Sequence, residues 1–458
     1  MLPVRVLFRL RILATALAAL ILLPVSLSQT AETVLHTFTY HADGGFPFAG
    51  LTLDAQGNLY GVSEYGGDPN EGVCCGVVFQ LTPGDGNWTF HVLHTFVGGD
   101  FDGESPTGSV VFDKVGNLYG TAQTAGLGFC GVVYELSPSE SGEWTESILH
   151  SFNNYRIGEI NDGCLPSSFL IFDEQGNLYG TTQQTGYGDC MTNAGCGTVF
   201  ELSPAQNGKW TEKILHRFPE QGSGDGVNPY GGLVFDSAGN LWGTTLAGGT
   251  SNAGTIFELS PQPGGTWKEK IVLNFTVSNG YLPYSALTID KSGNLYGTAY
   301  SGGKNSAGVI YRLSPQSGGD WTETLLHNFA ACTANDCPDG LDPLGGLVLD
   351  VSGDLYGTAT LGGAASEFCN PSLPNFFEGC GIVFKLSPKA NGTWSYSIIH
   401  RFPGEAEGAF LSPDHLAIDS NGNIFGTAVA GGDINANTIC PDALPEVPGC
   451  GVVFELTP

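Results

Sequence analysis

Five aspartates recur with a spacing that suggests ligand binding. Each precedes a Gly and stands a few residues before a Pro, and the series is Asp43, Asp102, Asp162, Asp225 and Asp339. A ring of such carboxylates could bind Ca²⁺ or a polyol. Asp-Gly before Pro is also an ordinary turn, and two copies carry Asn279 and Glu407 in place of Asp. Both interpretations stay open; no cofactor is expected to be required, and Ca²⁺ is the candidate ion.

Histidine recurs at one position of the sequence repeat. The copies are His36, His94, His150, His216, His327 and His400. The remaining copy has Leu273, and a position that accepts Leu is typical of packing rather than of a general base or a ligand. His41, His91 and His415 have no repeating partner, and no HExxH, GxSxG or Walker A string occurs in the sequence. The sequence therefore predicts neither a catalytic residue nor a dedicated metal site.

A second aspartate series is best explained by turn formation. Each member stands three residues before a Gly in a DxxGN string: Asp54, Asp113, Asp173, Asp236, Asp290, Asp350 and Asp419. Asp at the start of a turn accepts hydrogen bonds from its own backbone, and Gly or Asn supplies a positive φ. We expect these side chains to hold turns.

The elements that must position these residues repeat seven times. The string GNLYG, or a close variant, begins at Gly57, Gly116, Gly176, Gly239, Gly293, Gly353 and Gly422. Each repeat has four short segments rich in β-branched and aromatic residues, such as 231–236, 240–245, 254–261 and 266–275 in the fourth copy. Seven sets of four antiparallel strands predict an all-β, seven-bladed β-propeller. The rival, a β-solenoid, would need capping repeats.

The two ends of the chain predict how the ring closes. Residues 33–38 match the second half of a fourth strand, and residues 451–458 match a third strand. The last repeat has no fourth strand of its own. We therefore expect the N-terminal strand to pair with the C-terminal blade, which removes an open sheet edge. Residues 29–458 then form a single propeller domain.

We name the strands of each blade A to D from the channel outward. Strand D carries Trp and Phe eight residues apart, as in Trp144 and Phe152, and this even spacing predicts that both lie on one face. The B–C and D–A loops share one face of the ring and vary in length, whereas the other turns are uniform. We expect any ligand on the B–C/D–A face, with the Asp-Gly loops around the mouth of the central channel.

All twelve cysteines fall in these variable loops. An even number in an exported chain favours disulfides. Cys74 and Cys75 are left as an adjacent pair or as free thiols. Binding of a metal by thiolates is the alternative, but no CxxC pair occurs. The expected pairs are Cys190–Cys196, Cys332–Cys337, Cys369–Cys380, Cys440–Cys450 and Cys130–Cys164.

Residues 1–28 have the form of a secretory signal peptide. Three Arg precede an uncharged apolar run over residues 12–23, and Ser26 and Ser28 supply the small residues of a cleavage site. The apolar run is short for the alternative, an uncleaved membrane anchor. We predict cleavage after Ser28 and residence in the periplasm, at the cell surface or outside the cell, with no integral membrane segment in the mature chain.

The composition excludes several classes of protein. With 16 basic against 45 acidic residues and a net charge of −29, the chain is poorly suited to nucleic acid. A hydrophobic fraction of 41% argues against wholesale disorder. The 68 glycines follow no Gly-X-Y period, which excludes collagen. An acidic, globular monomer is expected.

The repeat GGLvfDxxGNLYGTtxxGG…GvvFELSP…WTexxLHxF resembles the GloVer tandem-repeat family of exported bacterial proteins, over residues 33–458. The resemblance implies a propeller-like repeat fold and a surface protein of the choice-of-anchor kind. It implies no activity and no functional residues. This chain stops at Pro458 without a sorting tail, so release or periplasmic residence is the alternative to surface attachment.

Two functions from different classes remain. The first is a non-enzymatic module that binds a glycan or a protein through the B–C/D–A face. The second is an extracellular hydrolase or lyase that acts on polysaccharide. The absence of a recognisable catalytic motif favours the binding module.

Overall fold

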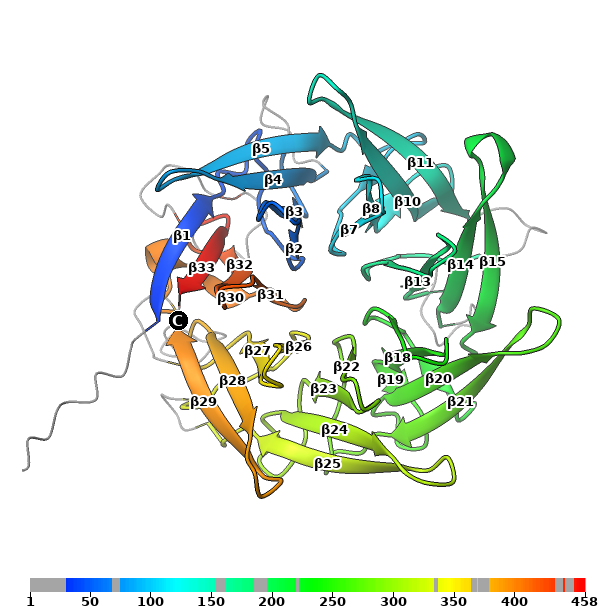
Figure 1. The fold of residues 1–458 in the computed structure, drawn as a ribbon, viewed down its shortest axis with the longest axis vertical. Helices are drawn as coiled ribbons and strands as arrows, with labels where there is room; N and C mark the ends of the chain where they lie inside the picture. Colours follow the sequence, from blue (N-terminus) through cyan, green and yellow to red (C-terminus); the bar gives the residue numbers. More distant parts are fainter. Residues whose placement is uncertain are drawn as a thin grey trace, which may run out of the picture.

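The computed structural model describes residues 30–67, 75–153, 162–184, 196–219, 222–332, 337–363, 369, 379–432, 440 and 449–457; the predicted signal peptide lies outside them. Seven antiparallel sheets, each the blade of a propeller, surround a central axis (Figure 1). The helical turns in these residues are two short 3₁₀ segments, η1 (Gln206–Gly208) and η2 (Glu405–Glu407). No helix among them is long and apolar enough to cross a membrane. The predicted all-β, seven-bladed propeller is confirmed.

Each blade runs from strand A at the centre to strand D at the rim (Figure 1). Blade 1 has β2 (Thr52–Leu53), β3 (Leu59–Ser63), β4 (Val77–Pro83) and β5 (Trp88–Thr95). Blade 2 has β7 (Val111–Phe112), β8 (Leu118–Ala122), β10 (Phe129–Pro138) and β11 (Trp144–Asn153). Blade 3 has β12 (Ile171–Phe172), β13 (Leu178–Thr182), β14 (Thr198–Pro204) and β15 (Trp210–Arg217). Blade 4 has β17 (Val234–Phe235), β18 (Leu241–Thr245), β20 (Thr255–Pro261) and β21 (Trp267–Asn274).

The remaining blades follow the same order. Blade 5 has β22 (Thr288–Ile289), β23 (Leu295–Ala299), β24 (Val309–Pro315) and β25 (Trp321–Asn328). Blade 6 has β26 (Val348–Leu349), β27 (Leu355–Ala359), β28 (Ile382–Pro388) and β29 (Trp394–Arg401). Blade 7 has β31 (Ala417–Ile418), β32 (Ile424–Ala430), β33 (Val452–Thr457) and β1 (Ala31–Thr37). Short strands join loops: β6 (Gly103–Glu104) pairs with β9 (Thr124–Ala125), β16 (Gly226–Val227) with β19 (Ala247–Gly248), and β30 (Ala409–Leu411) with β32.

The ring closes as the chain ends predict. Strand β1 pairs antiparallel with β33, from Ala31 opposite Thr457 to Thr37 opposite Val452. Figure 1 shows β1 and β33 side by side in one blade. The hydroxyl of Thr30 also donates to the carbonyl oxygen of Ile399, 2.7 Å away in blade 6. Because β1 covers the outer edge of β33, the last blade has four strands like the others.

The DxxGN strings form the expected turns. In blade 3, Asp173 Oδ1 accepts hydrogen bonds from the backbone nitrogens of Gln175 and Asn177 at 2.9 and 2.8 Å. Its Oδ2 accepts from Asn177 Nδ2 at 2.7 Å and from the Tyr179 hydroxyl at 3.1 Å. The second Gly of the motif is required by packing, since a Cβ on Gly180 would lie 2.6 Å from the Phe200 ring. The structural interpretation of this Asp series is therefore confirmed.

The core lies between the blades, and strand D contributes to it from both faces. Phe152 is fully buried and its ring lies 5.2 Å from Phe200 of the following blade. The Trp of strand D packs the other way: Trp144 lies 6.5 Å from the Tyr60 ring of the preceding blade. The prediction that Trp and Phe share a face was wrong. Each D strand has a one-residue register shift, as between Val133 and Tyr134 in the β10–β11 pairing, and such a bulge reverses the alternation of side chains.

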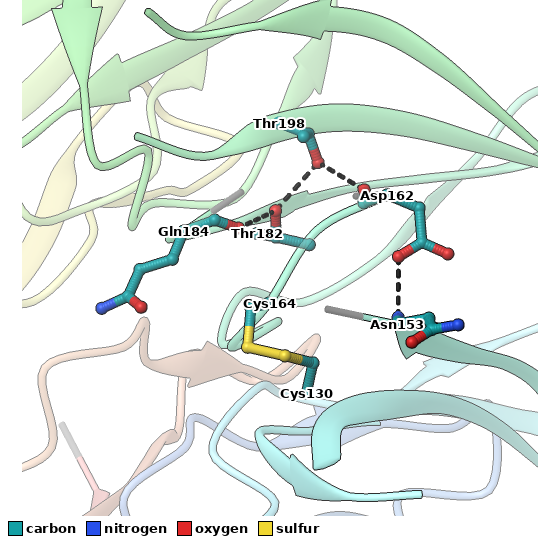
Figure 2. The surroundings of a disulfide bond; sticks show 7 residues. All are labelled: Cys130, Asn153, Asp162, Cys164, Thr182, Gln184 and Thr198. Carbon is teal, nitrogen blue, oxygen red and sulfur yellow. Dashed lines mark hydrogen bonds between the residues drawn. A yellow bond between two sulfur atoms is a disulfide. The ribbon is translucent and has the colours of Figure 1, made fainter. Parts of the chain in front are cut away.

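Four of the expected disulfides are present: Cys130–Cys164, Cys332–Cys337, Cys369–Cys380 and Cys440–Cys450. Cys75 is also disulfide-bonded, so the free-thiol alternative does not hold for it, and Cys74 lies outside the described residues. Cys190 lies outside them as well, so the pairing with Cys196 stays a prediction. Figure 2 shows Cys130–Cys164, which joins strand β10 of blade 2 to the loop that enters blade 3.

Candidate functional site

The five predicted aspartates lie at the outer contacts between blades, which we call seams, and not around the channel. Each carboxylate faces the Nε2 atom of the histidine in the strand D that directly precedes its loop. The nitrogen–oxygen distances are 3.2 Å for His36–Asp43, 3.5 Å for His94–Asp102, 3.1 Å for His150–Asp162, 3.3 Å for His216–Asp225 and 2.9 Å for His327–Asp339. None of the five lines the two channel cavities described below. The predicted ring at the channel mouth was therefore wrong.

The reason is that each D–A loop folds back and places its Asp against the end of the outermost strand. There the carboxylate accepts a hydrogen bond from the backbone at the end of strand D, as Asp162 Oδ1 does from the Asn153 nitrogen at 2.7 Å (Figure 2). Asp102 Oδ2 accepts in the same way from the Val97 nitrogen at 2.7 Å, and its Oδ1 accepts from the nitrogen of the next residue, Gly103, at 2.7 Å. The aspartate and histidine series look independent in the sequence, but each Asp carboxylate contacts the imidazole of one strand-D His.

A glutamate from the next blade completes the arrangement in several seams. Glu146 Oε1 lies 3.6 Å from His94 Nε2, and Glu212 Oε2 lies 3.8 Å from His150 Nε2. Sequence reasoning missed these residues. Their signal was present, because Glu stands two residues after the Trp and four before the His position in the WTExxLHxF string. The contact between neighbouring repeats was not visible in that spacing.

Burial makes these glutamates unusual. Burial and the nearby Asp102 charge raise the pKa of Glu146 to about 8. Burial and Asp225 do the same for Glu269, also to about 8. Burial alone would raise the pKa of Asp102, but the nearby His94 and hydrogen bonds from the Val97 and Gly103 nitrogens outweigh it and lower that pKa. Two buried carboxylates in contact share a proton, and both carry a charge only where a cation lies between them.

Three seams depart from this pattern. Between blades 7 and 1, the ring of Phe90 replaces the glutamate and stacks on His36 at 3.8 Å. Between blades 5 and 6, Tyr396 stacks on His327 at 3.9 Å. The seam between blades 4 and 5 has Leu273 in place of His, and Asn279 Nδ2 donates to Glu323 Oε2 at 2.8 Å.

The central channel is the second place where the repeats differ. The position two residues before strand A is small in five blades, namely Gly50, Ser109, Gly232, Ala286 and Gly346. In blades 3 and 7 it is Phe169 and His415, whose rings lie 5.4 Å apart, edge to face. Because these blades are not neighbours, the contact crosses the channel. Sequence reasoning set His415 aside because it does not repeat, and that departure from the repeat is the signal that identifies it.

Asp414 holds His415 in place. Its Oδ1 accepts from His415 Nδ1 at 2.7 Å, and Oδ2 accepts from the Gly50 nitrogen at 3.2 Å and from the Ser109 hydroxyl. Burial opposes the charge of Asp414, but His415 and these donors outweigh it and hold the pKa well below its usual range. Burial likewise lowers the pKa of His415, and the Asp414 charge more than compensates and raises it. Each of the two side chains therefore favours the charged form of the other.

Beside this pair the channel contains a cavity of about 310 Å³, on the side of the A–B turns. Apolar residues in strand A and directly before it, such as Leu170, Leu287 and Leu347, form most of its wall, and Asp414 and His415 form part of the remainder. An apolar pocket with a few convergent polar groups is the usual form of a small-molecule site.

The opposite mouth of the channel, on the B–C/D–A face, is aromatic. The ring of Tyr284 lies 5.4 Å from that of Tyr230 and 5.9 Å from that of Tyr300. Burial raises the pKa of the neighbouring Asp342 to about 6, although a hydrogen bond with Tyr300 opposes the shift. A second, smaller cavity lies at this mouth. Besides Tyr230 and Tyr284, its wall includes the hydroxyl-bearing residues Thr107, Ser167, Ser168 and Ser285.

The fold and these sites define a disulfide-containing seven-bladed β-propeller built from one repeated unit, with departures from the repeat at its channel. The chain belongs to the Gloeobacter/Verrucomicrobia repeat family, whose model matches residues 21–194 and 191–440. No curated protein matches the sequence.

Two solved structures are similar to this chain. One is a protein from Thermus thermophilus that is described as an oxidoreductase of the glucose dehydrogenase kind, with 13% identity, a TM-score of 0.40 and coverage of 93% of this chain and 99% of that one. The other is a gluconolactonase from Xanthomonas campestris, with 14% identity, a TM-score of 0.37 and coverage of 74% of this chain and 88% of that one.

Proposed function

We propose that this protein is an exported binding module that takes a neutral saccharide at the channel mouth on its B–C/D–A face. The observation that carries the proposal is the departure from the repeat at this mouth. Blades 4 and 5 place Tyr230 and Tyr284 where the other blades have unrelated residues, namely Phe48, Thr107, Ser167, Leu344 and Pro413. The two Tyr rings pack on each other and remain half-buried.

The chemistry of the mouth suits a sugar. Aromatic rings offer flat apolar faces, and Tyr hydroxyls and the Asp342 carboxylate offer partners for ligand hydroxyls. The innermost space below the two Tyr rings is only about 30 Å³, close to the volume of one water molecule. A saccharide would therefore lie across the mouth and not thread the channel. The net charge of −29 disfavours acidic polysaccharides.

A glycan array followed by titration calorimetry tests the proposal. The Y230A/Y284A variant should lose binding to any neutral saccharide that the wild type retains. F101A is the matched control, because Phe101 is an aromatic residue in a D–A loop, 82% exposed, outside the cavity wall. Unchanged affinity in Y230A/Y284A, or no binding to neutral glycans, would contradict the proposal.

The second candidate is a hydrolase or lyase, and the Asp414–His415 pair favours it. With Nδ1 held by Asp414, His415 Nε2 is the nitrogen left to act as a general base beside the 310 Å³ cavity. A polysaccharide-depolymerisation screen separates the candidates. Turnover by the wild type that H415Q abolishes would establish the enzyme, whereas binding without turnover would support the binding module.

Export and a monomeric state complete the proposal. Disulfides such as Cys130–Cys164 are typical of an oxidising compartment, and residues 1–28 have the sequence of a signal peptide. Mass spectrometry of the secreted or periplasmic protein should find Gln29 as the first residue. Light scattering should give the mass of a single chain. A cytoplasmic protein that keeps its first 28 residues would contradict export.

A further inference from the structure

Four seams bring the same three kinds of side chain together, and the proposed saccharide site uses none of them. In each, one His and two carboxylates offer donor atoms that all lie within 4.8 Å of one another. The sets are His94, Asp102 and Glu146; His150, Asp162 and Glu212; His216, Asp225 and Glu269; and His400, Glu407 and Glu32.

The seam between blades 1 and 2 has the spacing of a metal site. His94 Nε2 lies 3.5 Å from Asp102 Oδ1 and 3.6 Å from Glu146 Oε1, too far for a strong hydrogen bond. Ligands at about 2.1 Å around a tetrahedral Zn²⁺ are separated by about 3.4 Å. His94 Nε2 and Glu146 Oε1 are also buried without a hydrogen-bond partner among the described residues.

The seam between blades 6 and 7 adds an independent observation. The Glu32 side chain is only 6% exposed, and its Oε1 has no hydrogen-bond partner in the part of the chain that the structure describes. Its Oε2 lies 2.6 Å from His400 Nε2. A carboxylate oxygen that is buried and unpaired costs folding energy unless another group compensates for it.

The ligand types favour zinc over calcium. Ca²⁺ binds six to eight oxygen atoms, whereas each seam offers an imidazole and two carboxylates. Three protein ligands and a water molecule are a common Zn²⁺ set. The Asp102 carboxylate is already oriented by the Val97 and Gly103 nitrogens, and metal ligands are typically held by such outer hydrogen bonds.

We propose that these four seams bind Zn²⁺, each through one His and two carboxylates from two neighbouring blades. Each ion would link two blades at the rim of the ring. It would lie between the two carboxylates and would coordinate their buried oxygen atoms. The aspartates alone made Ca²⁺ the candidate ion, and the proposal prefers Zn²⁺ because this ion would use the His and both carboxylates. This site is independent of the saccharide site, and the failure of one leaves the other unaffected.

The chain supplies its own controls. The seam between blades 5 and 6 has the His327–Asp339 pair but Tyr396 in place of the second carboxylate. The seam between blades 4 and 5 has Leu273 in place of His. We expect no Zn²⁺ in either of them.

The experiment uses the mature chain, treated with a chelator and dialysed against ZnCl₂ or CoCl₂. Elemental analysis should find up to four Zn²⁺ per chain, and Co²⁺ should give the intense visible bands of a four-coordinate ion. H94L, which copies Leu273, should bind one ion fewer, whereas H327L should bind as many as the wild type. Y396E should gain one.

Three results would overturn the proposal: no zinc retained by the wild type, equal stoichiometry in H94L and H327L, or octahedral Co²⁺ spectra. Circular dichroism of each variant distinguishes the loss of a metal ligand from the loss of the fold. If H94L fails to fold, Y396E still tests the ligand set by its gain of an ion.

Discussion

The Cys130–Cys164 disulfide should contribute more to stability than the Cys332–Cys337 disulfide. The first closes a loop over a sequence separation of 34 residues and the second over 5. In the chain-entropy treatment, a cross-link restricts the unfolded state more when the loop is longer. For these two separations the disulfide stabilises the folded state by about 3.8 and about 2.1 kcal/mol at 25 °C. The expected difference in the free energy of unfolding is about 1.7 kcal/mol.

The assay is equilibrium unfolding in guanidinium chloride of the C130A/C164A and C332A/C337A variants. Both double variants remove two sulfur atoms. Cys130, Cys164 and Cys337 are all at most 2% exposed, whereas Cys332 is half-buried, so the loss of packing also costs more in C130A/C164A. An equal loss in the two variants, or a larger loss in C332A/C337A, would refute the entropy argument. That result would show that native-state contacts decide the contribution of each disulfide.

Three further outcomes are expected. Deletion of residues 29–38 removes β1 and exposes the edge of β33, so the melting temperature should fall and size-exclusion chromatography should show association; an unchanged monomer would contradict ring closure by this strand. F152A, at a residue 0% exposed, should lose about 3–5 kcal/mol in urea unfolding, and a loss below about 1 kcal/mol would show that the blades repack. The Asp414–His415 pair should stabilise the fold most between about pH 4 and about pH 6.5. The raised pKa of His415 means that its contribution is lost as the pH rises through its folded value, and the lowered pKa of Asp414 means that its contribution is lost as the pH falls through its folded value. H415Q should remove this dependence from urea unfolding measured at several pH values, and an identical profile in H415Q would contradict it.

The sequence was sufficient for the architecture because its signals are local. Alternating strands, DxxGN turns and Gly-rich loops depend on residues within a few positions of each other, as in the bonds from Gln175 and Asn177 to Asp173. Four disulfides were also predictable, three within single loops and Cys130–Cys164 across one strand-to-strand crossing. Ring closure followed from two half-repeats at the ends.

The candidate sites could be predicted from the sequence only in part. Strand-D His and loop Asp were both seen in the sequence, but their contact, and the addition of Glu146 to His94 and Asp102, depend on how blade 1 meets blade 2. The bulge in strand D was also not visible, and one extra residue moves the Phe of each strand to the face opposite its Trp.

The sequence by itself therefore determined the number of blades, the strand order, the closure and the turn chemistry, because each is set by periodicity and by short-range hydrogen bonds. Only the tertiary structure decided which repeating side chains meet across a seam and that His415 contacts Phe169 across the channel. These contacts join residues far apart in the chain. Their partners depend on the angle and distance between packed sheets, which no spacing within a single repeat records.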